Sequence, residues 1–223
     1  MKKQDSNDTF SSLERDALIA SGLTGESRIS DYMKKLDHIH QQAFHGIKDT
    51  DDLTYKARAL FGWLWEGKPF RYRSKGSFRL DQVMDSQLND SLRSVGNCLG
   101  LTLLYNCLLR KSGIFAQALY IENAFGRGPH VITILSTGDG LLDIENILPD
   151  GFDYRGHLHR PSRTKWGDKE LIADIYLSIG NECFEKGEPT EALKNYEKAI
   201  ALNPAYEKAH INRVILKGKT AGK

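Results

Sequence analysis

Hydrophobic residues recur at helical spacing over much of the first half of the chain. In 29–47 and 52–67 apolar side chains return every three or four positions, which is typical of amphipathic helices. The stretch 71–95 is mostly polar with scattered apolar residues, and we expect one short helix there. The run from Cys98 to about Lys111 is apolar on nearly every face, which predicts a helix buried at the centre of a domain.

After Gly113 the pattern changes to short runs rich in Ile, Val, Leu and Tyr, which predict strands. These runs are 114–122, 130–136 and 140–146, and glycine-rich turns separate them. The tight connection between the second and third runs predicts an antiparallel hairpin. We therefore expect an α+β fold in which a buried helix packs on an antiparallel sheet and further helices precede it.

The last quarter of the chain returns to a helical pattern with small and aromatic residues at fixed positions. These positions are Gly180, Gly187, Ala192, Tyr196, Ala199 and Pro204. With them, the segment 173–206 resembles one tetratricopeptide repeat (TPR), and 208–217 resembles the first helix of another. The resemblance implies a small all-α hairpin that binds a protein or peptide partner.

These patterns divide the chain into five expected parts. They are a flexible N-terminal tail at 1–28, a main domain at 29–150, a linker at 151–170, the repeat and a capping helix at 171–217, and a basic tail at 218–223. Within the N-terminal tail, a short helix capped by Ser11 or Ser12 is an alternative to loose chain.

Composition narrows the function classes. The chain has 223 residues, and 31 Lys and Arg nearly balance 29 Asp and Glu, so a nucleic-acid or membrane partner has no electrostatic support. The N-terminus lacks an apolar leader segment, and no run is long enough to span a membrane. The three cysteines make an odd count, which argues against a disulfide framework. We expect a cytoplasmic protein.

The candidate chemistry centres on Cys98. Asn97 is a favoured helix N-cap, so the Cys98 thiol is expected in the first turn, where the helix dipole favours a thiolate. His130 opens the second predicted strand, and Asp143 lies on the third. A cysteine nucleophile, a histidine base and an aspartate that orients the histidine make a triad for acyl transfer. The Cys98 backbone N–H would be one oxyanion donor, and Gln82, Gln87 and Asn97 are candidates for the second.

This arrangement resembles the transglutaminase-like superfamily of papain-like thiol enzymes over roughly residues 29–150. The resemblance rests on a cysteine at a helix start, Gly113-Ile114 after that helix, a histidine opening one strand and an aspartate on the next. Together with the repeat, the layout is similar to the bacterial Sir-type invasion-regulator group. The resemblance implies catalytic roles for Cys98, His130 and Asp143.

Two functions from different classes remain open. One is a cysteine-dependent hydrolase (a protease or amidase) or acyltransferase, and the other is a non-catalytic adaptor whose repeat binds a protein. No cofactor is expected, and no metal, because the spacing of His38, His40 and His45 does not bring them to one helical face. His157 and His159 are interpreted as parts of a solvated loop, and the alternative is a local anion contact with the arginines beside them. The sequence leaves the substrate, the partner and the oligomeric state undetermined.

Overall fold

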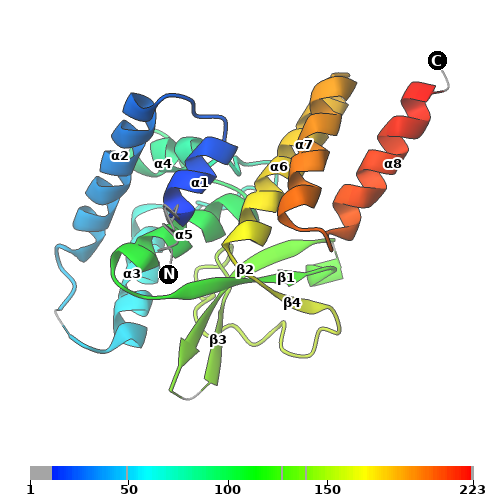
Figure 1. Ribbon diagram of the computed structural model, residues 1–223. Coiled ribbons are helices and arrows are strands. Elements are labelled where there is room, and N and C mark those ends of the chain that lie inside the picture. Colours follow the sequence, from blue (N-terminus) through cyan, green and yellow to red (C-terminus); the bar gives the residue numbers. More distant parts are fainter. Residues whose placement is uncertain (1–11, 49, 127, 139, 222–223) are drawn as a thin grey trace, which may run out of the picture.

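The computed structural model describes residues 12–48, 50–126, 128–138 and 140–221 (Figure 1). The helices are α1 (Leu13–Ala20), α2 (Glu26–Phe44), α3 (Leu53–Gly67), α4 (Leu80–Leu88), α5 (Cys98–Lys111), α6 (Asp168–Glu185), α7 (Pro189–Leu202) and α8 (Glu207–Ala221). The strands are β1 (Ala116–Ile121), β2 (His130–Thr137), β3 (Gly140–Ile144) and β4 (Arg163–Trp166), with a 3-10 turn at Ala124–Gly126. Across the described ranges, no helix combines the length and the apolar character that a membrane span requires.

The strands form one antiparallel sheet in the order β3, β2, β1, β4. The predicted hairpin is β2–β3, in which Ile134 lies opposite Asp143. β1 lies between β2 and β4 and pairs with both. The α+β prediction is confirmed as a mixture of helices with a small antiparallel sheet.

The predicted buried helix is α5. Every residue from Leu99 to Leu109 is buried, and α5 packs against β1 and β2. Tyr105, also fully buried, donates its hydroxyl proton to the Ala57 carbonyl at 2.7 Å and so links α5 to α3. This helix is therefore apolar around its whole circumference because it is buried on all sides, as the sequence predicts.

Buried polar side chains fix the rotation of α5 on the sheet. Thr133 donates its hydroxyl proton to Asn106 at 2.7 Å. Asn146 donates to the Thr102 hydroxyl at 3.1 Å and to the Thr133 hydroxyl at 2.9 Å. Buried polar groups need such partners, so any other rotation of α5 would leave several of them unpaired. The network thus sets the N-terminal end of α5 relative to the start of β2.

The segment expected to be a flexible tail includes an ordered helix, although its first part, 1–11, lies outside the described residues. Ser12 caps α1 by accepting a hydrogen bond from the Arg15 N–H at 3.3 Å. Leu13, Ala17 and Leu18 are buried, and α1 packs against α6. The expectation of a loose chain does not hold for α1, because these apolar side chains anchor it to the core.

The segment 151–170, expected to be a linker, contains β4 and the start of α6. β4 adds a fourth strand to the sheet beside β1. Trp166 is 4% exposed, and its ring stacks on Tyr120 with the centroids 4.3 Å apart. Its strand was not predicted because β4 is a short edge strand with two exposed residues, which gives little hydrophobic alternation.

The last three helices follow the repeat pattern (Figure 1). α6 and α7 pack closely: a Cβ atom on Gly180 would lie 2.5 Å from the Tyr196 ring, so a glycine is needed there. α8 packs on α7 and extends into the predicted basic tail. α6 also contacts α1, α5 and β4, so the repeat shares a core with the rest of the chain.

Candidate active site

Cys98 is the first residue of α5 and is partly exposed. The Asn97 side chain caps the helix by accepting a hydrogen bond from the Gly100 N–H at 3.0 Å. The helix start approaches Ser77 so closely that a Cβ on Gly100 would lie 2.5 Å from the Ser77 carbonyl oxygen. Gly96 and Gly100 therefore let the start of α5 approach the backbone at Ser77 closely, and Cys98 lies between them at the positive end of the helix dipole.

The other two cysteines are packing residues, as predicted. Cys107 is 0% exposed and Cys183 is 8% exposed. Burial raises the pKa of both thiols. A raised pKa disfavours the reactive thiolate, so Cys98 is the candidate nucleophile of the three.

His130 opens β2 and lines the same cleft as Cys98. Its ring is held within the protein, since only 6% of the residue is exposed. Burial lowers the pKa of His130, but its interactions with Cys98 and Glu145 outweigh burial and raise it to about 10. A protonated imidazole beside a thiol is the arrangement that generates a reactive thiolate.

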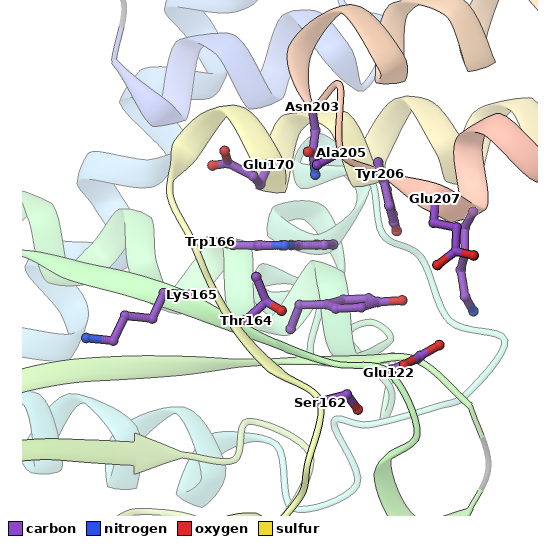
Figure 2. Close-up of a pocket in the computed structure, with 12 residues that line it drawn as sticks. Glu122, Ser162, Thr164, Lys165, Trp166, Glu170, Asn203, Ala205, Tyr206 and Glu207 are labelled. Atoms are coloured by element: carbon purple, nitrogen blue, oxygen red, sulfur yellow. The ribbon is translucent and has the colours of Figure 1, made fainter.

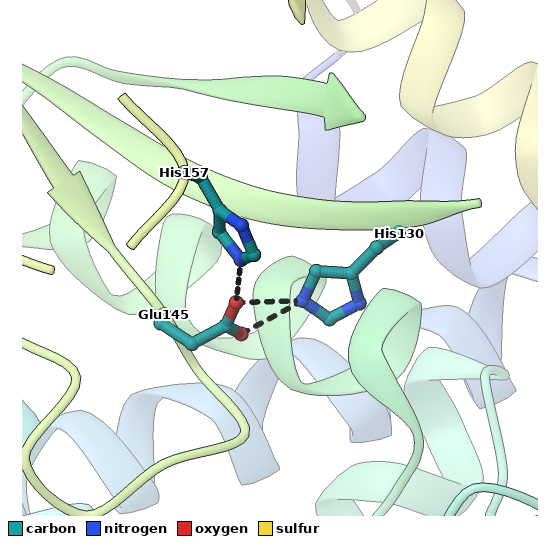
Figure 3. A group of neighbouring side chains, drawn as sticks. All are labelled: His130, Glu145 and His157. Carbon is teal, nitrogen blue, oxygen red and sulfur yellow. Dashed lines mark hydrogen bonds and ion pairs between the residues drawn. The ribbon is translucent and has the colours of Figure 1, made fainter. Parts of the chain in front are cut away.

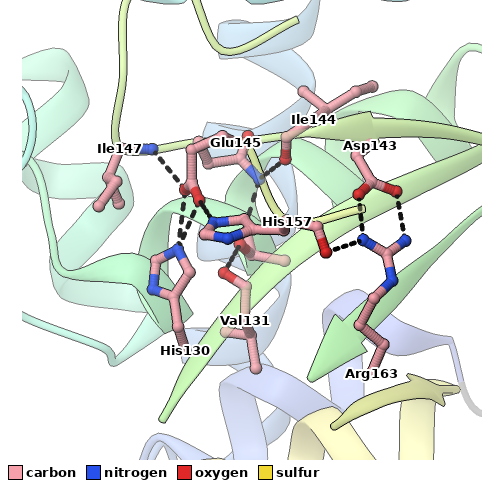
Figure 4. Close-up of polar contacts among 10 residues, drawn as sticks. His130, Val131, Asp143, Ile144, Glu145, Ile147, His157 and Arg163 are labelled. Atoms are coloured by element: carbon pink, nitrogen blue, oxygen red, sulfur yellow. Dashed lines mark hydrogen bonds and ion pairs between the residues drawn. The ribbon is translucent and has the colours of Figure 1, made fainter. Parts of the chain in front are cut away.

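The carboxylate on the far side of His130 is Glu145, directly after β3 (Figure 4). Both of its oxygens lie 2.8 Å from His130 Nε2. Glu145 is fully buried; burial raises its pKa, but the hydrogen bonds from His130 and His157 outweigh this and lower the pKa overall. Because Nε2 donates to Glu145, Nδ1 is the nitrogen left for the thiol. Glu145 therefore orients the imidazole.

Asp143, the expected orienting acid, has a different partner. Arg163 donates two hydrogen bonds to it, from Nη1 at 2.7 Å and from Nη2 at 3.0 Å (Figure 4). The hairpin register places Asp143 opposite Ile134, four positions beyond His130. Four residues span about 13 Å along a strand, so the register separates Asp143 from the imidazole. The expected contact between Asp143 and His130 is corrected to Glu145.

A second imidazole binds Glu145 from the other side (Figure 3). His157 Nε2 lies 3.0 Å from Glu145 Oε2. His157 is fully buried, and its ring contacts Phe125 and Tyr154 with centroid distances of 4.7 and 5.0 Å. The interpretation as a solvated loop is wrong for His157, because aromatic rings and the chain after β3 enclose this side chain. The same interpretation fits His159, which is exposed.

Glu145 and His157 are the site residues that the sequence did not single out. Asp143 and Glu145 stand at positions i and i+2, which share one face of an extended strand, so both carboxylates fit the same pattern. For Glu145 this doublet was the available signal. His157 lies among turn residues and charged residues that give no periodicity, and we find no sequence signal for it.

The same three residues, His130, Glu145 and His157, have the composition of a metal site, with ligand atoms within 4.8 Å of one another. Their geometry is that of hydrogen bonds, because each Nε2 faces a carboxylate oxygen at 2.8 to 3.0 Å. A metal would need the nitrogen lone pairs directed at a common point instead. The arrangement therefore supports a carboxylate held by two N–H donors.

The candidates for the second oxyanion donor differ in position. Asn97 lines the cleft beside Cys98, and its side-chain oxygen is used in the helix cap. Gln82 accepts a hydrogen bond from the Ser77 hydroxyl at 2.7 Å. Gln87 is buried on α4. Asn97 is thus the amide of the three that borders the cleft.

A cleft of about 430 Å³ opens at Cys98 and His130. One side comes from the thiol core and includes Tyr120 of β1 and Val131 of β2. The rest of the lining comes from the helical repeat. The repeat residues that line it are Asp174, Leu177, Ser178 and Asn181 of α6, Tyr206 just before α8, and Lys208, Ile211 and Asn212 of α8.

Figure 2 shows a second hollow, of about 370 Å³. Its lining shares Tyr120, Tyr206 and Lys208 with the Cys98 cleft, so the two adjoin. The Tyr120 and Trp166 rings stack in its wall, and Tyr206 meets both rings edge to face. Glu122, Glu170 and Glu207 add carboxylates around it. The surface around Cys98 therefore continues along the junction between sheet and repeat.

Comparison with known proteins gives one match. The family described as TPR repeat matches residues 180–213, which lie in α6, α7 and α8. No curated protein and no solved structure matches the chain. The match supports protein interaction as a role of the repeat, and it covers none of Cys98, His130 and Glu145.

Proposed function

We propose that the protein is a cysteine-dependent enzyme that acts on amide or peptide bonds, with Cys98 as nucleophile, His130 as base and Glu145 as the orienting acid. The observation that carries the proposal is that His130 lines one cleft with a thiol at a helix start and is bound by a buried carboxylate. An imidazole held in this way takes up the thiol proton and later returns it to a leaving amine.

In the proposed reaction the Cys98 thiolate attacks the carbonyl carbon, and a C–S bond forms. His130 gives its proton to the amine as the C–N bond breaks, which leaves a thioester on Cys98. Water or a second amine then attacks the thioester, loses its proton to His130 and releases the thiol. N–H groups in the first turn of α5, including that of Cys98, would stabilise the oxyanion. Hydrolase and acyltransferase share these steps.

The finer assignment to the transglutaminase-like superfamily belongs to this proposal. Its support is the order of a cysteine opening α5, a histidine opening β2 and an acid near the end of β3, with α5 packed on the sheet. The similarity to the Sir-type group has the repeat after this core as its support. The proposed catalytic acid is Glu145, two positions after the residue that the resemblance indicated.

An adaptor function is the second candidate. The observation that favours it is the family match to the repeat alone, together with apolar side chains on α8 that face solvent. Ile211, Val214 and Ile215 are 47%, 65% and 48% exposed. In that function the thiol core would be a scaffold, and Cys98 would have no chemical role.

The rate of Cys98 alkylation by iodoacetamide at neutral pH distinguishes the two. An unassisted thiol is only a few per cent ionised at that pH, so we expect His130→Ala to slow alkylation about tenfold. The exposed His159 provides the matched control, and His159→Ala should alkylate like the wild type. Equal rates in all three proteins would reject the enzyme proposal and favour the adaptor.

A further inference from the structure

The repeat forms part of the wall of the Cys98 cleft, although the sequence predicted a separate domain for the repeat. α6 and α8 border the same cleft as Cys98 and His130. Any substrate carbonyl that reaches Cys98 through this cleft therefore passes α6 and α8. Partner binding by the repeat and chemistry at Cys98 would take place in one space.

Two side-chain amides on this wall are already oriented. Asn181 Oδ1 accepts a hydrogen bond from the Tyr196 hydroxyl at 3.0 Å and from Asn212 Nδ2 at 2.8 Å. These bonds fix both amide planes and leave the Asn181 N–H groups and the Asn212 carbonyl for a ligand. Side-chain amides offer both a donor and an acceptor, which is what a peptide main chain requires.

Two opposite charges continue the polar wall. Asp174 accepts a hydrogen bond from the Tyr206 hydroxyl at 2.7 Å. Lys208 lines the same cleft as Asp174. An apolar acyl chain in this space would remove water from these groups without offering hydrogen bonds, which is costly. Leu177 and Ile211 add apolar surface to the same cleft, so the lining fits a ligand that offers both polar and apolar groups, as a peptide does.

We infer that α6 and α8 hold an extended peptide segment in this cleft, so that the segment bound by the repeat is the acyl substrate of Cys98. The inference rests on the proposed function for its chemical step, whereas the binding site itself does not need a reactive thiol. Asn181 and Asn212 contact the main chain of the peptide, and Asp174 and Lys208 contact its polar side chains. The repeat thereby sets the substrate class of the thiol site.

Labelling of Cys98 by three electrophiles tests the inference. The first is a pool of N-acetylated tripeptidyl chloromethyl ketones, the second is an alkyl chloromethyl ketone of equal length, and the third is iodoacetamide. In each reaction the thiolate forms a C–S bond and displaces halide. Each rate is divided by the iodoacetamide rate of the same protein, which corrects for the reactivity of the thiol. We then expect the peptidyl pool to react about tenfold faster than the alkyl reagent, which corresponds to about 1.4 kcal/mol of binding.

Variants on the wall locate the effect. Asn212→Ala should slow the peptidyl reaction about fivefold, since one hydrogen-bonding group is lost, and should leave the iodoacetamide rate unchanged. Ser178→Tyr should slow the peptidyl reaction further by filling the cleft from α6. Val214→Ala is the control, because Val214 is on α8, is 65% exposed and is not among the residues that line the cleft. A peptidyl rate no faster than the alkyl rate, or one indifferent to both wall variants, would overturn the inference.

A binding measurement keeps the inference separate from the chemistry. In Cys98→Ala, a pool of tripeptides that carry a diazirine side chain should photo-crosslink to α6 and α8, and Ser178→Tyr should suppress the crosslinks. Crosslinks there together with an inert Cys98 would support the peptide site and reject only the enzyme. Crosslinks outside the cleft would reject the peptide site whatever the reactivity of the thiol.

Discussion

Two buried carboxylates, Asp143 and Glu145, stand two residues apart at the end of β3, and they bind different kinds of nitrogen donor. Glu145 accepts N–H groups from two imidazoles, His130 and His157, whereas Asp143 accepts two hydrogen bonds from the guanidinium of Arg163. Arginine stays protonated in proteins, whereas the surroundings of an imidazole decide whether it holds or releases its proton. Although both carboxylates are buried, the site at Glu145 is therefore suited to proton transfer, and the pair of Asp143 and Arg163 is suited to stabilising the fold.

The ion pair of Asp143 and Arg163 also supports the site at Glu145. Arg163 Nη1 donates a further hydrogen bond to the His157 carbonyl at 2.8 Å. Asp143 thus holds Arg163, Arg163 holds the chain at His157, and His157 holds Glu145. The comparison implies that both carboxylates stabilise the fold, whereas only a change at Glu145 strongly affects the reactivity of Cys98.

The largest effect on stability is expected at Glu145. Glu145→Gln leaves two buried imidazoles facing a neutral amide, and breaking a buried ionic site by removing one partner costs about 3 to 5 kcal/mol. Urea denaturation should show this loss in the free energy of unfolding. A loss smaller than that of Asp143→Asn would remove the difference between the two sites.

A smaller loss is expected at Asp143. Asp143→Asn leaves the Arg163 charge without its counterion, and because 19% of the Arg163 side chain is exposed, water compensates in part. We expect the free energy of unfolding to fall by about 2 to 3 kcal/mol. The same urea series measures it, with the exposed pair variant Asp153→Asn as the control. An effect as small as that of the control would contradict a structural role for Asp143.

The two carboxylates also show how far the sequence could lead. The cap at Asn97 and the apolar run of α5 are local signals, and both placed Cys98 correctly at a helix start. Strand composition likewise placed His130 at the head of β2. These features depend on neighbouring residues, which a pattern can reveal.

The assignment of the acid depended on a property that a local pattern does not contain. Asp143 and Glu145 share a strand face, and the β2–β3 register decides which of them meets His130. β4 and His157 come from the segment of lowest periodicity, so their positions depend on tertiary packing with Tyr120, Phe125 and Glu145. The shared cleft likewise depends on how α6 packs on the core.

A loss of stability smaller than that at Asp143 is expected at His157. His157→Phe keeps a ring in the aromatic surroundings but removes one N–H donor from Glu145, which should lower the free energy of unfolding by about 1 to 2 kcal/mol. His157→Gln retains an N–H donor and should recover part of the loss. Equal stability of the wild type and His157→Phe would show that His157 does not hold Glu145.

Stability is also expected to depend on pH through His130. The pKa of His130 is raised from 6.5 to about 10 by its partners, so the protonated form stabilises the folded protein below pH 6.5. This contribution should decline as the pH rises from about 6.5 through about 10. The difference in unfolding free energy between the wild type and His130→Gln should shrink over that range. A difference that grows with pH would contradict the raised pKa.

The most direct test of the central claim is the iodoacetamide rate at Cys98, measured in parallel for the wild type, Glu145→Gln and Asp143→Asn at neutral pH. Without Glu145 the pKa of His130 falls and the imidazolium that supports the thiolate is lost, so the account predicts a rate about tenfold lower in Glu145→Gln. Asp143→Asn should stay within about twofold of the wild type. A slow Asp143→Asn beside an unchanged Glu145→Gln would contradict the assignment of Glu145 as the acid that orients His130.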